Sequence, residues 1–475
     1  MIEMKSTMTL SPFVKNKHYF LMDSAEILNF TLTIDQGVSR KIPLLLILRD
    51  SRGYVRIQYQ TPIVEEKLVV AKDPKFCSAG CVGGEISSGN WELEVVYAPH
   101  CADKALKFTG RKVDYTVNIS VNDELEREYN REYFCKENVF INEHDFEKVV
   151  NEEHRWYKGD FHVHTNLTDG EIDDELAMSV CEKQDLDFLY ATEHNIVMPS
   201  YQKGSTLIIP SMELTTPYGH YNMFGMKEYV NFTEHLDESF NSQSIDELFS
   251  LMKEKGCLIS VNHPFMKPWA NQIDINLENV HTMEIMCDPT YKKSKPSTLE
   301  ALNFFDQMWL NGLKIWGIGG SDSHLHPSKT FPGSKDPSIY GDPGTYVLCN
   351  GLSIKNLKDA IQRGRIYFSR FRKLEIDIQN EGKTIYVGDE VQGNVRYTIQ
   401  TDKPCEWRLI INGQITEKGF GSEITFDFDL NEGSYARVEG WEDDELVAFI
   451  NPIHHNVKRK NIKTWYEVLG GVENE

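Results

Sequence analysis

The hydrophobic pattern changes its period twice along this chain of 475 residues, and the change limits the folds open to it. From about residue 19 to residue 121 the pattern consists of short β-rich runs at 27–33, 43–48, 54–59, 91–97 and 115–121. Runs of this length between Gly, Asn and Asp residues are typical of a β-sandwich, and no helical period is visible among them. The stretch 122–153 is strongly charged, so we interpret it as a solvated connector.

Between about residues 156 and 372 the pattern alternates between strand and helix. Strands are predicted at 161–164, 187–192, 207–212, 258–261, 283–286 and 314–318. Helices are predicted at 172–184, after the capping pairs Ser244/Glu247 and Ser297/Glu300, and from Ser353 toward Gly364. Repeated strand–helix units imply a parallel sheet, closed or open.

After residue 373 short strands return at 384–387, 395–400, 407–411, 424–428, 437–441 and 446–450, which predicts a second β-sandwich. We therefore expect three domains. Residues 1–150 would form an N-terminal β-sandwich with the connector, residues 151–372 an α/β domain, and residues 373–475 a C-terminal β-sandwich.

The composition limits the kinds of partner and the cellular compartment that we expect for this protein. Lys and Arg number 50 against 72 Asp and Glu, and a net charge of −22 disfavours binding to a nucleic-acid polymer. No apolar run approaches the roughly 18 residues that a membrane-spanning helix needs, and no secretory signal is visible. Nine scattered cysteines suit reduced thiols, so we expect a cytoplasmic protein without a membrane partner. A structural zinc pair at Cys77 and Cys81 is an alternative to two core residues, although no second pair matches it.

Histidines gather in the strand–helix region. Ten of the 15 lie between His154 and His326, where an even spread would place about five or six. His162 and His164 are two residues apart on a predicted strand, so their side chains project to one face. Seven further residues follow near the ends of later strands, where such folds hold their working residues: Asp169, His194, Glu213, His220, His263, Asp322 and His324.

Each of these nine residues taken alone is most simply a hydrogen-bonded buried polar residue. Burying all nine without a cation would leave many charges and donors uncompensated. We therefore predict a multinuclear metal site. Its nitrogen and oxygen ligands suit zinc, manganese or iron and do not choose among them.

The ordered motifs resemble those of the PHP (polymerase and histidinol phosphatase) metallo-phosphoesterases. They are DFHVHT at 160–165 with Asp169-Gly170, TEH at 192–194, NHP at 262–264 and GSDSH at 320–324. The segments GNW at 89–91 and NPI at 451–453 look like the branch named for carbaryl hydrolase. This resemblance implies a distorted (β/α)7 barrel, flanked by the two β-sandwiches, that holds two or three divalent metal ions.

The resemblance also implies a ligand set for each ion. The first ion would be held by His162, His164, Glu213 and Asp322, the second by Glu213, His220 and His263, and the third by Asp169, His194 and His324. Glu213, Asp322 and His324 would also be the catalytic residues. His220 lies outside the general family motifs, and without it the second ion would need water.

These expectations together favour a metal-dependent hydrolase. Two neighbouring ions lower the pKa of a shared water and hold the substrate's oxygens, which suits phosphoryl transfer. We expect a phosphoesterase that acts on small phosphate mono- or diesters through a metal-bound hydroxide. The same hydroxide would serve a carbamate or ester hydrolase, which stays open as an alternative. A third hypothesis, from another class, is a non-catalytic ligand-binding protein with structural metals; a homo-oligomer is also compatible with the sequence.

Two smaller features complete the sequence picture. The basic stretch 364–373 is either a solvated edge at a domain junction or a substrate site in which Arg365 faces a phosphate. Ser321 and Ser323 lack the G-x-S-x-G context of a nucleophile. We interpret them as residues that shape the backbone so that Asp322 and His324 point inward.

Overall fold

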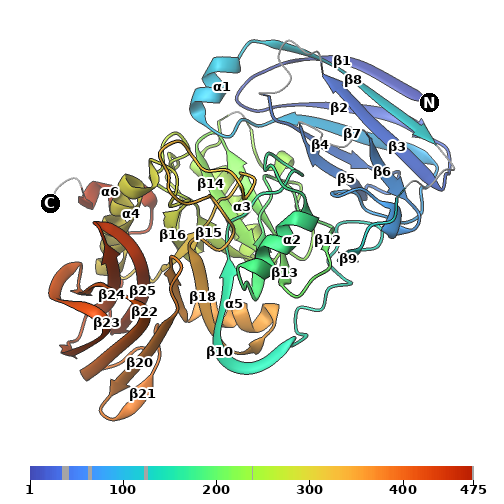
Figure 1. Ribbon diagram of the computed structural model, residues 1–475. Helices are drawn as coiled ribbons and strands as arrows, with labels where there is room; N and C mark the ends of the chain where they lie inside the picture. The colour runs from blue at the N-terminus through green and yellow to red at the C-terminus, as the bar shows by residue number, and fades with distance from the viewer. Residues whose placement is uncertain (35–41, 62–66, 122–126, 238, 473–475) are drawn as a thin grey trace.

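The computed structural model describes residues 1–34, 42–61, 67–121, 127–237 and 239–472. Within these residues the chain is a strand-rich mixed α/β protein with four sheets, of four, 15, two and four strands. Figure 1 shows the N-terminal strands at one end of the molecule, the C-terminal strands at the other and most of the helices between them.

The N-terminal strands form two antiparallel four-stranded sheets. One has the order β1-β8-β3-β6 and the other the order β2-β7-β4-β5. Their bounds are β1 Ile2–Thr9, β2 Val14–Met22, β3 Ile27–Ile34, β4 Leu44–Arg49, β5 Val55–Gln60, β6 Leu68–Ala71, β7 Gly89–Tyr97 and β8 Lys112–Val121. Alternate residues of β8 are buried, as expected for a strand with one face on a core.

A short helix, α1 (Ala102–Phe108), and a 3-10 turn, η2 (Pro74–Phe76), interrupt these strands. The expectation of no helix in this part of the chain was therefore wrong. Only Ala105 and Phe108 of α1 are buried, and a helix of seven residues is too short to show a clear helical period.

The middle of the chain forms the main part of the 15-stranded sheet, in the order β17-β16-β15-β14-β13-β11-β10-β18-β19. The bounds are β10 Asn151–Asp160, β11 Phe188–Ala191, β13 Leu207–Thr216, β14 Gly219–Phe224, β15 Leu258–Val261, β16 Thr282–Cys287, β17 Trp316–Gly320, β18 Gly344–Leu352 and β19 Ile366–Ser369. The helices are α2 Asp174–Lys183, α3 Ser242–Glu254, α4 Ser294–Leu310 and α5 Ile354–Gln362, with 3-10 turns η3 Phe232–Glu234 and η4 Leu277–Asn279. The sheet is mixed, because β14 and β18 run antiparallel to their neighbours.

The first and seventh strands of the run β17 to β10 come together beyond their paired residues. The backbone N–H of Asp322 donates to the His162 carbonyl at 2.8 Å, and Val163 forms a parallel bridge with Ser323. Thr345 on β18 also bonds both backbone groups of Gly319 on β17. The carboxyl ends of β17 and β10, at opposite ends of this run of strands, therefore lie next to each other.

Several predicted boundaries were wrong for local reasons. The prediction of a strand at 161–164 was wrong: β10 already ends at Asp160, whose carboxylate accepts the backbone N–H groups of His162 and Ser321 at 3.0 and 3.1 Å. Asn241, not Ser244, caps α3, and α4 begins at Ser294, ahead of its predicted Ser297 cap. Ser353 does cap α5 as predicted.

The C-terminal strands continue the 15-stranded sheet through the antiparallel pair β19–β25. They are β20 Leu374–Asn380, β21 Lys383–Ile385, β22 Gly393–Ile411, β23 Gln414–Leu430, β24 Ser434–Glu442 and β25 Glu445–His455, and a final helix, α6 Trp465–Val472, follows. They surround a second core that includes Trp407, Phe426 and Ile450. The domain boundary at residue 372 stays a prediction.

The charged connector is not solvated throughout. Residues 122–126 of it lie outside the described part of the chain. The connector then forms a short strand, β9 (Arg131–Tyr133), which pairs with β12 (Ser200–Gln202) of the central part of the chain. Arg131 is 6% exposed, and its guanidinium binds the Asp174 carboxylate at 2.9 and 3.0 Å. This buried ion pair fixes the connector to α2.

The structure also describes the helices and the cysteines on which the sequence analysis drew. No helix among the described residues is long and apolar enough to cross a membrane. All nine cysteines are free and buried. Burial raises the pKa of Cys77 to about 11, and in the described part of the chain neither Cys77 nor Cys81 belongs to a group that could hold a metal ion.

Candidate metal centre

The structure brings all nine predicted ligands together beyond the strand ends. They come from the segment after β10 (His162, His164, Asp169), the segment after β11 (His194), β13 (Glu213), β14 (His220), the segment after β15 (His263) and the segment after β17 (Asp322, His324). A nitrogen or oxygen atom of each lies within 3.6 Å of such an atom on another member.

Glu213 is the centre of this cluster and is fully buried. Five imidazole nitrogens surround its carboxylate: His162 Nε2 at 3.2 Å, His220 Nδ1 at 3.2 Å and His263 Nε2 at 3.5 Å from Oε1, and His194 Nδ1 at 2.6 Å and His164 Nε2 at 3.6 Å from Oε2.

Two aspartates extend the cluster toward solvent. Oδ1 of Asp322 lies 3.3 Å from His162 Nε2 and 3.1 Å from His164 Nε2. Oδ1 of Asp169 lies 3.2 Å from the Nε2 atoms of both His194 and His324. The side chains of Asp169, Asp322 and His324 are 33%, 17% and 29% exposed, so this side of the cluster is the accessible one.

Hydrogen bonds on the far side of three imidazole rings fix which nitrogen carries the proton. His162 Nδ1 lies 2.8 Å from Glu284 Oε1, His324 Nδ1 lies 2.8 Å from the Asp322 carbonyl, and His220 Nε2 lies 2.8 Å from the His100 carbonyl. A neutral ring that donates there presents a lone pair at its other nitrogen.

Those lone pairs all face carboxylate oxygens at 3.2 to 3.3 Å. Two lone pairs at that separation repel unless a proton or a cation lies between them. Nδ1 of His220, Nδ1 of His164 and Nδ1 of His263 are also buried without a hydrogen-bond partner among the described residues. This donor set fits divalent metal ions, because each ion would replace a repulsion with two bonds.

Three groups of ligand atoms are close enough to hold an ion each. They are His164 with Asp169, His194 and His324; His162 with Glu213 and His263; and His162 with Cys287 and Asp322. These groups overlap the predicted sets, but His164 joins the third set and Cys287 is new. The assignment of each residue to a particular ion therefore stays a prediction.

The charges of the cluster are strongly coupled. Burial acts to raise the pKa of Asp322, but His162, His164 and His324 outweigh it and hold that pKa well below its usual range. Burial acts to lower the pKa of His194, and Asp169 and Glu213 reverse this and raise it to about 10. These opposite shifts follow from the short distances between the imidazoles and the carboxylates of the cluster.

Strained backbone conformations occur at the residues that aim the cluster. Asp322 has φ +46° and His263 has φ +28°, in the left-handed region that residues other than Gly rarely adopt. The Ser321 hydroxyl donates to the His162 carbonyl and the Ser323 hydroxyl to the Ser338 carbonyl, both at 3.1 Å. These bonds hold the turn around Asp322, which agrees with the backbone role expected for the two serines.

Two residues at the centre were missed by the sequence analysis. Glu284, on β16, accepts from His162 Nδ1 at 2.8 Å and from the backbone N–H of His263 at 2.6 Å. A carboxylate in the buried run TMEIMC was a signal that could have identified it.

His100 is the second missed residue, and it comes from the segment between β7 and α1. Its ring lies 4.2 Å from that of His194, and its Nδ1 lies 3.5 Å from Asp169 Oδ2. Burial lowers the pKa of His100 to about 3, so the ring is neutral. No motif in the β-rich region of the sequence marked it.

The structure does not bring Arg365 to this centre. Its guanidinium donates to the Val387 carbonyl and pairs with Asp389 Oδ1 at 2.5 Å, beside the Tyr386 ring. The alternative interpretation, a solvated edge at a domain junction, does not describe Arg365 either, because its side chain is only 16% exposed and is paired with Asp389.

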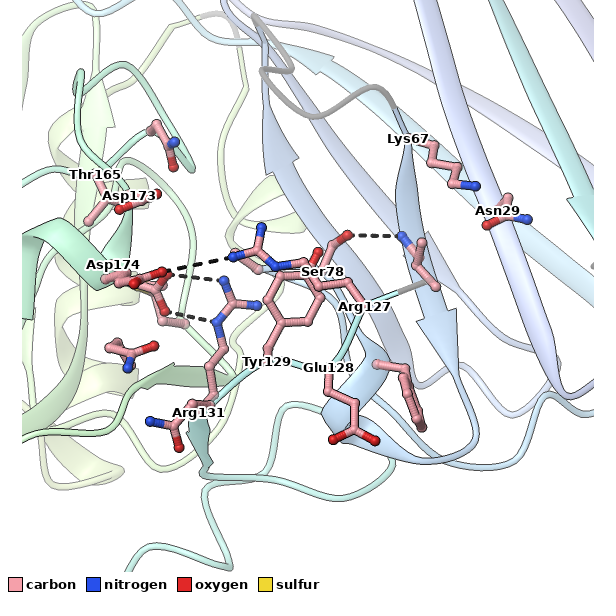
Figure 2. A pocket seen from close by; sticks show the side chains of 18 residues that line it. Asn29, Lys67, Ser78, Arg127, Glu128, Tyr129, Arg131, Thr165, Asp173 and Asp174 are labelled. Atoms are coloured by element: carbon pink, nitrogen blue, oxygen red, sulfur yellow. Dashed lines mark hydrogen bonds and ion pairs between the residues drawn. The ribbon is translucent and has the colours of Figure 1, made fainter. Parts of the chain in front are cut away.

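A pocket of about 220 Å³ opens onto the accessible side of the cluster. A larger cavity of about 550 Å³ lies elsewhere, between the N-terminal strands and α2, where Arg131 pairs with Asp174 (Figure 2). None of the nine predicted ligands lines that larger cavity. The smaller pocket is therefore the one joined to the candidate chemistry.

Comparison with known proteins finds no matching family model and no matching curated protein. One solved structure, a two-domain protein containing a predicted PHP-like metal-dependent phosphoesterase from Bacteroides vulgatus ATCC 8482, is 14% identical with a TM-score of 0.36, covering 64% of this chain and 98% of its own. An FMN-binding β-glucuronidase from Facaelibacterium prausnitzii L2-6 is 8% identical with a TM-score of 0.18, covering 94% and 92%. Likenesses this weak carry no functional argument, so the function must be argued from the site.

Proposed function

We propose that this protein is a metal-dependent hydrolase, and specifically a phosphoesterase that acts on small phosphate mono- or diesters. The observation that carries the proposal is the set of imidazole nitrogens that face the carboxylates of Glu213, Asp169 and Asp322 across 3.2 to 3.3 Å. Such an arrangement is stable when divalent cations lie between the atoms, and several cations so close together suit hydrolysis.

When bound, the ions would supply Lewis acidity that activates a water and neutralises charge on the phosphoryl oxygens. The chain's own residues would orient the reaction. Oδ1 of Asp322 faces the imidazoles and Oδ2 lies 3.6 Å from the Cys287 thiol, so Oδ2 is the oxygen that would orient the attacking water by accepting a hydrogen bond from it. The water oxygen bonds to phosphorus, the bond from phosphorus to the ester oxygen breaks, and the leaving oxygen receives the proton that the water releases.

Glu213 and His324 would have supporting catalytic roles. Glu213 lies between the two histidine groups and would bridge two of the ions. His324, fixed by its bond to the Asp322 carbonyl, lies on the accessible side and would orient the phosphoryl group.

The finer structural expectations belong to the same proposal. The seven strands from β17 to β10, with the contacts of Asp322 and Ser323 at His162 and Val163, support a distorted (β/α)7 barrel of the PHP kind. The carbaryl-hydrolase branch, zinc, manganese or iron as the metal, and two or three ions per chain are further parts of this hypothesis.

Metal content per chain and a substrate panel test the proposal. The purified protein, loaded in turn with Mn²⁺, Zn²⁺ or Fe²⁺, would be assayed with p-nitrophenyl phosphate, bis-p-nitrophenyl phosphate and an aryl methylcarbamate. We expect turnover of at least one phosphate ester, and its loss by about 100-fold or more in Asp322→Ala. The surface variant Asp427→Ala, which removes a carboxylate paired only with exposed Arg396, is the control.

The same panel separates the alternatives. Turnover of the carbamate alone would replace the phosphoesterase with a carbamate or ester hydrolase. Bound metal without turnover of any substrate would favour a ligand-binding protein with structural metals.

A further inference from the structure

The pocket over the metal centre has two unlike walls. One wall is apolar and comes from the segments after three successive strands: Met266 and Trp269 after β15, Tyr291 after β16, and Leu325 and Phe331 after β17. The ring centroids of Trp269 and Tyr291 lie 6.0 Å apart, and those of Tyr291 and Phe331 lie 5.3 Å apart. Aromatic rings at these distances and tilts form a continuous surface for another ring.

The rest of the pocket is polar. Among the residues that line it, Lys104 on α1 is the one that carries a Lys or Arg side chain. Lys104 is half-buried, and its ammonium makes no hydrogen bond or ion pair with any residue that the structure describes. An anionic ligand in the pocket would therefore pair with this ammonium without displacing a protein carboxylate from it.

His100 explains why Lys104 is held at this place. The His100 carbonyl accepts from His220 Nε2 at 2.8 Å, and the His100 ring lies 4.2 Å from that of His194. The first turn of α1 follows directly, so Lys104 is fixed relative to the cluster and not merely near it. The N-terminal strands thus contribute a charged group to a pocket otherwise built by the central strands.

We propose that this pocket selects a phosphate monoester of a single-ring aromatic alcohol, with Lys104 binding the phosphoryl oxygens and the ring lying on the wall of Trp269, Tyr291 and Phe331. This inference rests on the proposed function and names its substrate class. The volume fits: a cavity of roughly 150 Å³ holds benzene, and this pocket of about 220 Å³ leaves room for a phosphoryl group beside one ring.

Charge also favours an anionic ligand at this position. Two divalent ions would balance the four carboxylates Asp169, Glu213, Glu284 and Asp322, and the ammonium of Lys104 adds a positive charge to this balanced centre. A neutral carbamate would leave that ammonium uncompensated. Lys104 therefore separates the two substrate classes that the metal centre alone does not distinguish.

Binding of two non-hydrolysable probes to the metal-loaded full chain tests the inference. We expect phenylphosphonate to bind about tenfold more tightly than methylphosphonate, measured by calorimetry, because only the former buries a ring. Lys104→Met should weaken both by about tenfold or more and leave their ratio unchanged, since it removes a charge-assisted hydrogen bond but not the wall. Lys104→Arg, which keeps the charge, should restore most of the affinity.

Lys107→Met is the matched control, because Lys107 lies on the same helix, is exposed and does not line the pocket. Hydrolysis of p-nitrophenyl phosphate should fall with phosphonate affinity in Lys104→Met, while any turnover of a neutral aryl methylcarbamate should be unchanged. Equal effects of the two Lys→Met variants, or equal affinity for the two probes, would overturn the inference even if the enzyme hydrolyses phosphate esters. Absence of both phosphate-ester turnover and phosphonate binding in the unaltered protein would instead overturn the proposed function.

Discussion

Glu284 shows how one side chain sets the geometry of several proposed ligands. Its two carboxylate oxygens accept from His162 Nδ1 and from the backbone N–H of His263. It thereby fixes the tautomer of His162 and the position of a residue with strained backbone. Loss of an outer partner of this kind typically lowers metal affinity by about 10- to 100-fold.

We predict that Glu284→Gln lowers metal affinity by about 10- to 100-fold. The amide offers one oxygen and one NH₂ group, so one of the two donors of His162 and His263 would face another donor. Competition titration against a chromophoric chelator measures this. Glu278→Gln, at an exposed glutamate paired with Arg459, is the control, and equal affinities of the two variants would contradict the role of Glu284.

For Arg365, in contrast to Glu284, we predict that a substitution has little effect on the proposed site. Because its guanidinium is bound to Asp389 and to the Val387 carbonyl away from the pocket, Arg365→Met should change KM for a phosphate ester by less than about twofold. Steady-state kinetics of the variant beside wild type decide this. A rise in KM of tenfold or more would restore Arg365 as a phosphate contact.

At the scale of elements, the strand–helix alternation was predictable because each element has its own hydrophobic period. β15 has the predicted bounds, and β13, β16 and α2 overlap their predicted ranges closely. Boundaries failed where a side chain from elsewhere replaced a backbone partner, as Asp160 does beyond the end of β10. Such replacements depend on contacts that are distant in sequence, so no local pattern contains them.

His281, the residue immediately before β16, gives the strand pair β15–β16 a pH-dependent stability. Burial, reinforced by Lys253 and Lys358, lowers the pKa of His281 from 6.5 to about 4, and its Nδ1 accepts from the Ile259 backbone N–H at 3.1 Å. The folded state therefore binds fewer protons than the unfolded state between these values. The stabilisation is fully present above pH 6.5 and is lost as the pH falls toward 4.

We predict that His281→Asn, whose amide oxygen accepts the same hydrogen bond without titrating, resists acid better. Relative to wild type, its free energy of unfolding should rise by about 2 kcal/mol between pH 7 and pH 4. Urea unfolding at both pH values measures this, with the exposed His235→Asn as control. A parallel decline of both variants with wild type would assign the acid sensitivity to other groups.

At the scale of the whole molecule, the N-terminal and central strands share one core and one site. A continuous apolar cluster includes Leu46 and Leu93 of the N-terminal strands, Ile259 of β15 and Trp465 of α6. Gln58 bonds both the N–H and the carbonyl of Val197 at 3.1 Å, and His100 contacts Asp169 of the proposed ligand cluster. Separation of these parts would expose both the core and the site.

We therefore predict that chelation destabilises the N-terminal and central strands together. Calorimetry should show one transition for this shared core, and its midpoint should fall on metal removal. Each ion present at about 100 times its Kd contributes roughly 2.7 kcal/mol, and readdition of the metal should reverse the shift. Two transitions, of which chelation moves only one, would show that the N-terminal strands unfold independently.

The sequence by itself determined which residues gather and which chemistry they suit, because histidines and carboxylates near successive strand ends meet wherever such strands share one sheet. It also determined the β-rich character of both ends of the chain. Only the tertiary structure decided the pairing of lone pairs with carboxylates, the entry of His100 and Lys104 into the site, the role of Glu284 and the exclusion of Arg365. These are contacts between residues far apart in the chain, and their distances follow from how the sheets pack, which local periodicity does not encode.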